Sequence, residues 1–120
     1  MSRRDTERLT DILDAVEAIR IHLQRGDLSD GLIYDAVRVR LIEIGEAVKV
    51  IPVDVLAAEP STPWRDIAGM RDRLAHRNFD TTHSIVQGTV VNDLPPLERA
   101  VLRLRAATKS SDPGGGPPEG

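Results

Sequence analysis

The spacing of the apolar residues constrains this chain more than any other feature, because they recur every three or four positions over most of residues 5–105. This period is that of an α-helix, and no segment shows the strict alternation of a half-buried β-strand. From about Asp5 to Arg25, one apolar stripe is formed by Leu9, Ile12, Leu13, Val16, Ile19 and Leu23. We therefore expect an all-α protein.

Cap and turn residues divide this pattern into successive helices. Ser2 and Asp5 have the spacing of a capping pair at the start of the first helix. A polar turn over residues 27–30 leads into a second helix, which reaches about Val50. Pro52 ends it, because proline has no backbone N–H and crowds the preceding turn.

A connector over residues 53–61, with at most one helical turn, separates the second helix from the third. Thr62 is the expected N-cap of the third helix and Pro63 its first residue. The pattern of this helix continues through Leu74 and ends near His76. The motif that holds the best candidate site residues therefore falls at the end of a helix.

A fourth helix is expected after a cap at Thr81 or Thr82, and Pro95-Pro96 should break it. A fifth, C-terminal helix then continues to about Leu104. The predicted architecture is an antiparallel up-down bundle of four main helices plus the fifth. Residues 1–108 form one helical domain, and the Gly/Pro-rich residues 109–120 form a disordered tail.

The second helix has more apolar surface than one stripe requires. Beyond its main stripe it carries Val39, Ile42, Val50 and Ile51. A helix that is apolar on more than one side packs against more than one neighbour, and burial in a dimer would satisfy it. Gly45 lies in the middle of this helix, where glycine costs about 1 kcal/mol relative to alanine. Either another helix or chain approaches closely there, or the glycine is merely tolerated.

Composition excludes several classes of function. The chain has no cysteine, so disulfides, thiolate metal sites and cysteine catalysis are excluded. Its three aromatic residues are too few for recognition of bases by a platform of stacked rings. No apolar run reaches the length of a membrane span, and the N-terminal residues are charged, so we expect a cytoplasmic protein.

The strongest candidate site is the pair Arg71 and His76, separated by four residues. Arginine is permanently charged and binds phosphate oxygens, and histidine can exchange a proton near neutral pH. On a straight helix the two would point roughly 140° apart, so the helix must end at His76 or the site must be shared with another chain. The alternative is a pair of surface charges with a histidine at a helix C-terminus. Such a pair alone is common by chance.

No metal or cofactor is expected. The three histidines do not have the spacing of zinc ligands with carboxylates, and neither a phosphate-binding glycine loop nor a serine-nucleophile motif is present. His22 beside the first apolar stripe suggests a structural or surface role, and His83 at the start of the fourth helix suggests an exposed residue.

Three ordered blocks in the sequence carry a family resemblance that covers roughly residues 5–105. They are RLIEIGEA at residues 40–47, PWRDIAGMRDRLAH at residues 63–76 and NDLPPL at residues 92–97. In these blocks the chain resembles the HepT-like ribonuclease toxin branch of the HEPN superfamily, whose members share the R-x4-H motif. Three blocks at family-like separations are far more specific than the motif alone.

The resemblance implies a homodimer that brings two R-x4-H motifs into one cleft. It implies a metal-independent endoribonuclease, the toxin of a type VII toxin–antitoxin system, with a minimal nucleotidyltransferase as antitoxin. Carried onto this chain, Arg71 and His76 are the catalytic pair. The residues implied to support them or bind RNA phosphates are Asp72, Arg73, Arg77 and Asn78.

One position departs from the family pattern. In relatives, the antitoxin transfers AMP to a tyrosine two residues after the histidine, and here that residue is Asn78. Asparagine has no phenolic hydroxyl, so no AMPylation site is expected. Tyr34, the only tyrosine of the chain, is not expected to replace it. A catalytically inactive HEPN-type module that binds a nucleotide or a partner protein remains the alternative.

Overall fold

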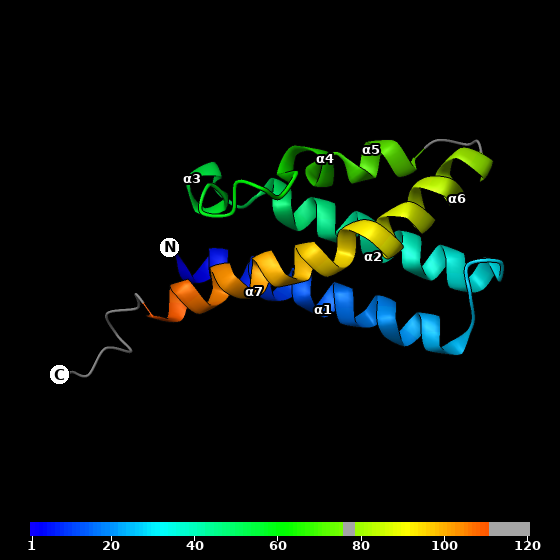
Figure 1. Cartoon of the computed structure of the whole chain (residues 1–120), viewed down its shortest axis with the longest axis horizontal. Helices are drawn as coiled ribbons and strands as arrows, with labels where there is room; N and C mark the ends of the chain where they lie inside the picture. Colours follow the sequence, from blue (N-terminus) through cyan, green and yellow to red (C-terminus); the bar gives the residue numbers. More distant parts are fainter. Residues whose placement is uncertain (76–78, 111–120) are drawn as a thin grey trace.

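The computed structural model describes residues 1–75 and 79–110, and all regular structure within these ranges is helical (Figure 1). The predicted all-α fold is confirmed. The expected catalytic histidine and its two neighbours, residues 76–78, lie outside the described part of the chain, as does most of the predicted tail, residues 111–120. None of the described helices is long and apolar enough to span a membrane.

Two long antiparallel helices, α1 (Arg3–Arg25) and α2 (Gly31–Lys49), form the base of the fold (Figure 1). The predicted capping box at the start of α1 is present, because Ser2 and Asp5 exchange side-chain-to-backbone hydrogen bonds. Asp30 caps α2 by accepting a hydrogen bond from the N–H of Leu32. The predicted stripe of α1 is largely buried, and the residues of this stripe in the core are Leu9, Ile12, Val16 and Ile19.

The central helix of the fold is α2, which contacts α1, α4 (Trp64–Ala68), α5 (Met70–Leu74) and α6 (Phe79–Gly88). Most of its apolar surface is therefore buried within one chain, and Ile51, just beyond its end, is also in the core. Val39 and Val50 remain exposed. The wide apolar surface of the helix thus reflects mainly its neighbours in the same chain, although Leu32 in its first turn is also exposed.

The predicted third helix is divided in two. A short helix, α3 (Val53–Leu56), provides the expected helical turn in the connector. The helix α4 then ends at Ala68, and only Gly69 separates it from the start of α5. Thr62 does not act as the N-cap, because Pro63 holds that position and no side chain caps the helix. The fixed φ angle of Pro63 starts the helix without a side-chain acceptor.

The fourth and fifth predicted helices form one continuous helical run, so the predicted break at Pro95-Pro96 is wrong. A π-helical turn, η1 (Thr89–Asp93), joins α6 to α7 (Leu94–Ser110), and the N–H of Leu94 donates to the carbonyl of Thr89. The wider turn ends where α7 begins, which puts both prolines in the first turn of α7. Proline is tolerated in the first turn of a helix, and the π-helical turn directly before it already departs from the regular α-helical hydrogen-bond pattern.

The start of α6 also differs from the prediction. The helix begins at Phe79, before either of the expected caps, Thr81 and Thr82. Thr82 is instead buried, and its hydroxyl accepts a 2.9 Å hydrogen bond from the hydroxyl of Tyr34 on α2. Thr82, which the local sequence predicts to be a helix cap, therefore connects α6 to α2 instead.

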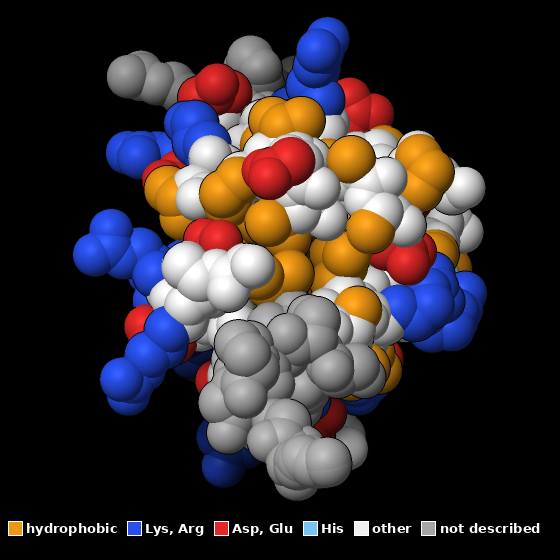
Figure 2. Space-filling view, turned by 90° about the vertical axis from the view of Figure 1, so that its left-hand side faces the viewer, with side chains coloured by type: hydrophobic (Ala, Val, Ile, Leu, Met, Phe, Trp, Pro, Cys, Tyr) orange, Lys and Arg blue, Asp and Glu red, His pale blue; other side chains and the backbone are white. Residues whose placement is uncertain are grey.

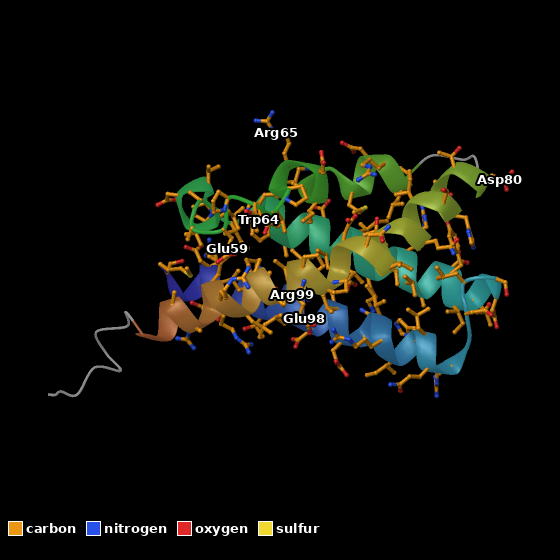
Figure 3. The ribbon with its side chains drawn as sticks, in the orientation of Figure 1. Glu59, Trp64, Arg65, Asp80, Glu98 and Arg99 are labelled. Carbon is orange, nitrogen blue, oxygen red and sulfur yellow. The ribbon has the colours of Figure 1, made fainter. Side chains whose placement is uncertain are left out.

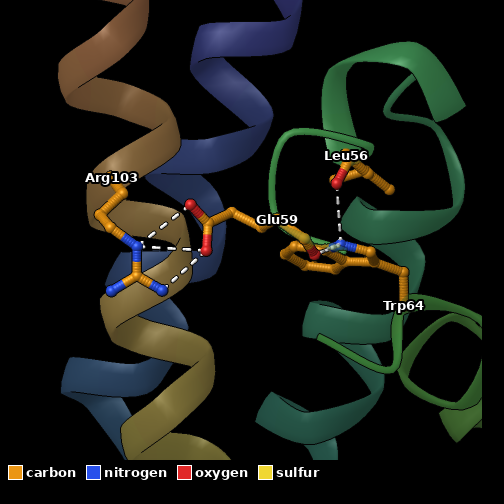
Figure 4. Close-up of polar contacts among 4 residues, drawn as sticks. All are labelled: Leu56, Glu59, Trp64 and Arg103. Carbon is orange, nitrogen blue, oxygen red and sulfur yellow. Dashed lines mark hydrogen bonds and ion pairs between the residues drawn. The ribbon is translucent and has the colours of Figure 1, made fainter. Parts of the chain in front are cut away.

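The α3 segment is held between α4 and α7 by two side chains (Figure 4). Trp64 donates its indole N–H to the carbonyls of Leu56 and Glu59 at 3.1 and 3.0 Å. The carboxylate of Glu59 accepts hydrogen bonds from Nε and Nη2 of Arg103 at 3.1 and 2.7 Å. These bonds hold the pKa of Glu59 below its ordinary value.

Hydrophobic side chains gather on the end of the molecule that carries α3 (Figure 2). A hollow of about 380 Å³ lies there between α2, α3 and α4, and its apolar lining includes Val48, Ile51, Val53, Leu56, Trp64 and Ala68. Val53 is 83% exposed at its edge. A second groove, of about 630 Å³, runs between α1 and α2 and is lined by both acids and arginines.

Candidate functional site

The candidate site is built on α5, which places Arg71 between buried neighbours. Met70 and Leu74 belong to the core, so they fix the face of α5 that packs on α2. The side chain of Arg71, the residue after Met70, is 65% exposed. Its guanidinium is therefore accessible to a ligand from solvent.

Gly45 sets how closely α5 can approach α2. A Cβ atom at this position would lie 2.8 Å from the carbonyl oxygen of Ile67 and 3.1 Å from Cβ of Met70. Real Cβ atoms are essentially never found 2.8 Å from another heavy atom. Close approach of other helices therefore explains this glycine. These helices are α4 and α5 of the same chain.

Glu46, which follows Gly45, forms an ion pair with Arg71. The distance from Glu46 Oε2 to Arg71 Nη1 is 3.6 Å. The Oε2 atom is buried and accepts no hydrogen bond, so this guanidinium is its charge partner. Sequence reasoning missed Glu46 as a site residue. The sequence feature that could have indicated Glu46 is the adjacent mid-helix glycine, Gly45, because it marks where another helix comes close.

The other predicted supporting residues lie on different sides of α5. Arg73 lines a hollow of about 170 Å³ toward η1 and α7, together with Asp66 and Asp93. Asp72 is exposed on the surface. Arg71 is thus the arginine of α5 that meets Glu46, whereas Arg73 faces a separate set of acids. Arg77 and Asn78 lie outside the described residues.

The C-terminal end of α5 is held by a side chain from α2. Arg38 Nε donates a 3.0 Å hydrogen bond to the carbonyl of Leu74, the last residue of the helix. A carbonyl in this position has no partner within its own helix. The helix α5 ends at Leu74, two residues before His76, which lies outside the described residues.

Tyr34, the only tyrosine, is not available for modification in this structure. It is 7% exposed, and its hydroxyl is engaged with Thr82. Its ring stacks on His83, with centroids 5.3 Å apart. The prediction that His83 is exposed is wrong, because this side chain is half-buried and its Nε2 donates to the carbonyl of Leu28 at 3.0 Å.

Other candidate groups in the described part of the chain are His22 and the acidic side chains. His22 accepts a hydrogen bond from Arg40 Nε at 3.4 Å, in keeping with a structural role. Within residues 1–75 and 79–110, no group of three or more His, Asp or Glu side chains is arranged to hold a metal ion. The chemistry that the described residues offer is an exposed guanidinium, backed by a carboxylate, at the end of a short helix.

An all-helical fold that carries such an arginine five positions before a histidine is typical of a candidate phosphate-binding or phosphodiester-cleaving protein. Comparison with known families identifies this class of protein. A family model described as "Ribonuclease HepT-like" matches residues 10–104, so this chain belongs to the HepT-like family. The matched range contains both Arg71 and His76.

Individual relatives agree with this assignment. A protein of Thermococcus cleftensis named "Probable ribonuclease HepT" is 35% identical over 88% of this chain and 99% of its own length. A protein of Methanocaldococcus jannaschii whose name includes the term RNase is 33% identical over 87% of this chain and 90% of its own length. A third, from Caldanaerobacter subterraneus subsp. tengcongensis and also with RNase in its name, is 42% identical over 55% of this chain and only 60% of its own length. No solved structure matches the chain.

Proposed function

We propose that this chain is a metal-independent endoribonuclease that acts in the cytoplasm as the toxin of a type VII toxin–antitoxin system. The observation that carries the proposal is the family match, which spans residues 10–104 and includes the whole R-x4-H motif. The exposed guanidinium of Arg71 supports it, because a residue that binds the phosphate of RNA must be reached from solvent.

The proposed reaction is attack of a ribose 2′-hydroxyl on the adjacent phosphorus. His76 acts either as the general base that accepts the proton of the hydroxyl or as the general acid that gives a proton to the leaving 5′-oxygen, and water serves in the other role. The bond from the 2′-oxygen to phosphorus forms, and the bond to the 5′-oxygen breaks. The leaving 5′-oxygen takes up a proton, which gives a 2′,3′-cyclic phosphate and a 5′-hydroxyl. Arg71 stabilises the negative charge that builds on the phosphoryl oxygens. DNA, which has no 2′-hydroxyl, should not be cleaved.

The proposal includes a homodimer and an antitoxin partner. Val39 on α2 and Val50, just beyond its end, are exposed apolar side chains that a second copy would cover. A minimal nucleotidyltransferase is the proposed antitoxin. Because Asn78 occupies the position of the modified tyrosine and Tyr34 is buried, the proposed neutralisation is by binding and not by transfer of AMP to a tyrosine.

The test compares the wild-type chain with Arg71→Ala and His76→Ala. We expect only the wild type to stop the growth of a bacterial host and to cleave RNA in the presence of a chelator. Losing the arginine should lower the cleavage rate by about 10²–10³-fold, as for other preorganised donors. Equal growth of all three strains, with no cleavage by purified wild type, would refute the proposal.

One observation favours a second candidate, a catalytically inactive module that binds a nucleotide or its partner. Residue 78 is Asn, at the position where the family resemblance implies the tyrosine that the antitoxin modifies. Such a module would bind its ligand equally well after His76→Ala and would not cleave RNA. Pull-down of the antitoxin by both forms, together with the cleavage assay, separates the two candidates.

A further inference from the structure

We propose that Glu46 of α2 is a positioning residue that fixes the guanidinium of Arg71 for catalysis. The inference rests on the proposed ribonuclease function and deepens it by adding a residue outside the R-x4-H motif. Glu46 does not contact RNA in this proposal, and it acts only through Arg71.

The geometry of the ion pair leaves Arg71 free to bind phosphate. Nη1 is the guanidinium nitrogen that faces Oε2 of Glu46, at 3.6 Å. A guanidinium has five N–H donors in a planar fork, so the donors on the other nitrogens can still meet two oxygens of one phosphate. The carboxylate thus restricts where the guanidinium lies without occupying the donors that a phosphate needs.

The position of Glu46 is itself fixed by the packing of α2 against α5. Gly45 of α2 packs closely on Met70 of α5, with 3.1 Å between Cβ of Met70 and the position of a Cβ at Gly45. Glu46 and Arg71 are the next residue on each helix, so this contact sets the register that brings their side chains together. A buried carboxylate oxygen without a hydrogen bond also needs a cation beside it.

The exposure of the pair argues against a mainly structural role. Arg71 is 65% exposed and Glu46 is 43% exposed. Ion pairs this exposed contribute little to the stability of a fold. The reaction rate is much more sensitive to the position of a catalytic group, because a displacement of about 1 Å can lower the rate by roughly 10²-fold. The pair is therefore expected to affect catalysis much more than unfolding.

Glu43 provides a matched control on the same helix. It lies three residues before Glu46, has 50% exposure, and pairs with Arg40 through hydrogen bonds of 3.0 and 3.3 Å. Glu43→Gln removes the same charge from the same helix and breaks an ion pair of similar exposure, but it leaves Arg71 and its partner in place.

The experiment measures kcat and KM for the wild type, Glu46→Gln, Glu43→Gln and Arg71→Ala. The substrate is an RNA oligonucleotide taken from the site that the wild type cleaves most strongly in total RNA, in a buffer with chelator. Glu46→Gln should lower kcat by roughly 10- to 100-fold with KM nearly unchanged, because the arginine acts on the transition state. Glu43→Gln should stay within about twofold of wild type, because its ion pair does not reach Arg71.

Two further variants tie the effect to Arg71. In the Arg71→Ala background, Glu46→Gln should cause no additional loss, because a residue that acts through another has nothing left to position. Glu46→Asp should restore part of the rate, since it keeps the charge on a shorter side chain. Thermal melting of each variant should be close to that of wild type.

The outcomes separate this inference from the proposed function. If wild type cleaves RNA and Glu46→Gln behaves like Glu43→Gln, the positioning role is refuted and the ribonuclease stands. A faster Glu46→Gln would also refute it, since the carboxylate would then compete with phosphate. Additive losses in the double variant would mean that Glu46 acts independently of Arg71. If wild type does not cleave RNA, both proposals fail.

Discussion

At the scale of single residues, the missing side chain of Gly45 decides how the site is assembled. Alanine there would place a Cβ 2.8 Å from the Ile67 carbonyl, and a backbone atom in a packed helix cannot move away cheaply. We expect Gly45→Ala to lower the free energy of unfolding by about 1–3 kcal/mol, although alanine is the better helix former. Urea unfolding measures this change.

Gly88 is the matched control for that substitution. It is the last residue of α6, has helical φ and ψ of −62° and −40°, and a Cβ there would meet nothing within 4 Å. Gly88→Ala should therefore raise the free energy of unfolding by about 0.4–1 kcal/mol. If both alanine variants stabilise the protein, the close contact of α2 with α4 and α5 is not as described.

At the scale of elements, the two short helices α4 and α5 depend on contacts from outside themselves. A helix of five residues is too short to be stable alone, and the Arg38 side chain holds the last carbonyl of α5. We expect Arg38→Met to lower the free energy of unfolding by about 1–2 kcal/mol and to speed hydrogen exchange across residues 70–74.

Arg65 on α4 is the control for this prediction, because its exposed side chain points away from the bundle (Figure 3). Arg65→Met should change neither the free energy of unfolding nor the exchange rates of α5. Equal effects of the two substitutions would show that charge alone, and not the bond to Leu74, accounts for the result.

At the scale of the whole molecule, two ion pairs tie α7 to distant parts of the chain. Arg103 binds Glu59 of the α3–α4 connection, and Glu98 accepts hydrogen bonds from Arg20 of α1. The arginines hold the pKa values of both glutamates below the ordinary value of 4.5. The unfolded chain therefore takes up protons first as the pH falls, so these pairs stabilise the fold at neutral pH and cease to do so in acid.

The corresponding measurement is the melting temperature between neutral pH and about pH 3, across the range where carboxylates titrate. We expect the wild type to lose stability below about pH 4.5, as the two glutamates become protonated. The double variant Glu59→Gln and Glu98→Gln should start from a lower melting temperature and show a shallower decline in acid. An unchanged acid slope would mean that other carboxylates dominate.

The local sequence was sufficient to predict the first two helices, because their signals lie within a few neighbouring residues. The stripe from Leu9 to Ile19 and the Ser2–Asp5 capping box both appear in the structure as expected. The same local reasoning failed at Pro95-Pro96, because one wider turn over Thr89–Asp93 moved the prolines into the start of α7. Whether a proline breaks a helix depends on where the helix restarts.

The sequence by itself determined that this chain is helical, which motif carries its candidate chemistry and which family it belongs to. Only the tertiary structure decided that Glu46 meets Arg71, that Thr82 binds Tyr34 and that α2 is covered on several sides. The physical reason is the separation along the chain over which each interaction acts. Helical periodicity and caps act between residues a few positions apart, whereas these contacts join separate helices and exist only once the helices pack.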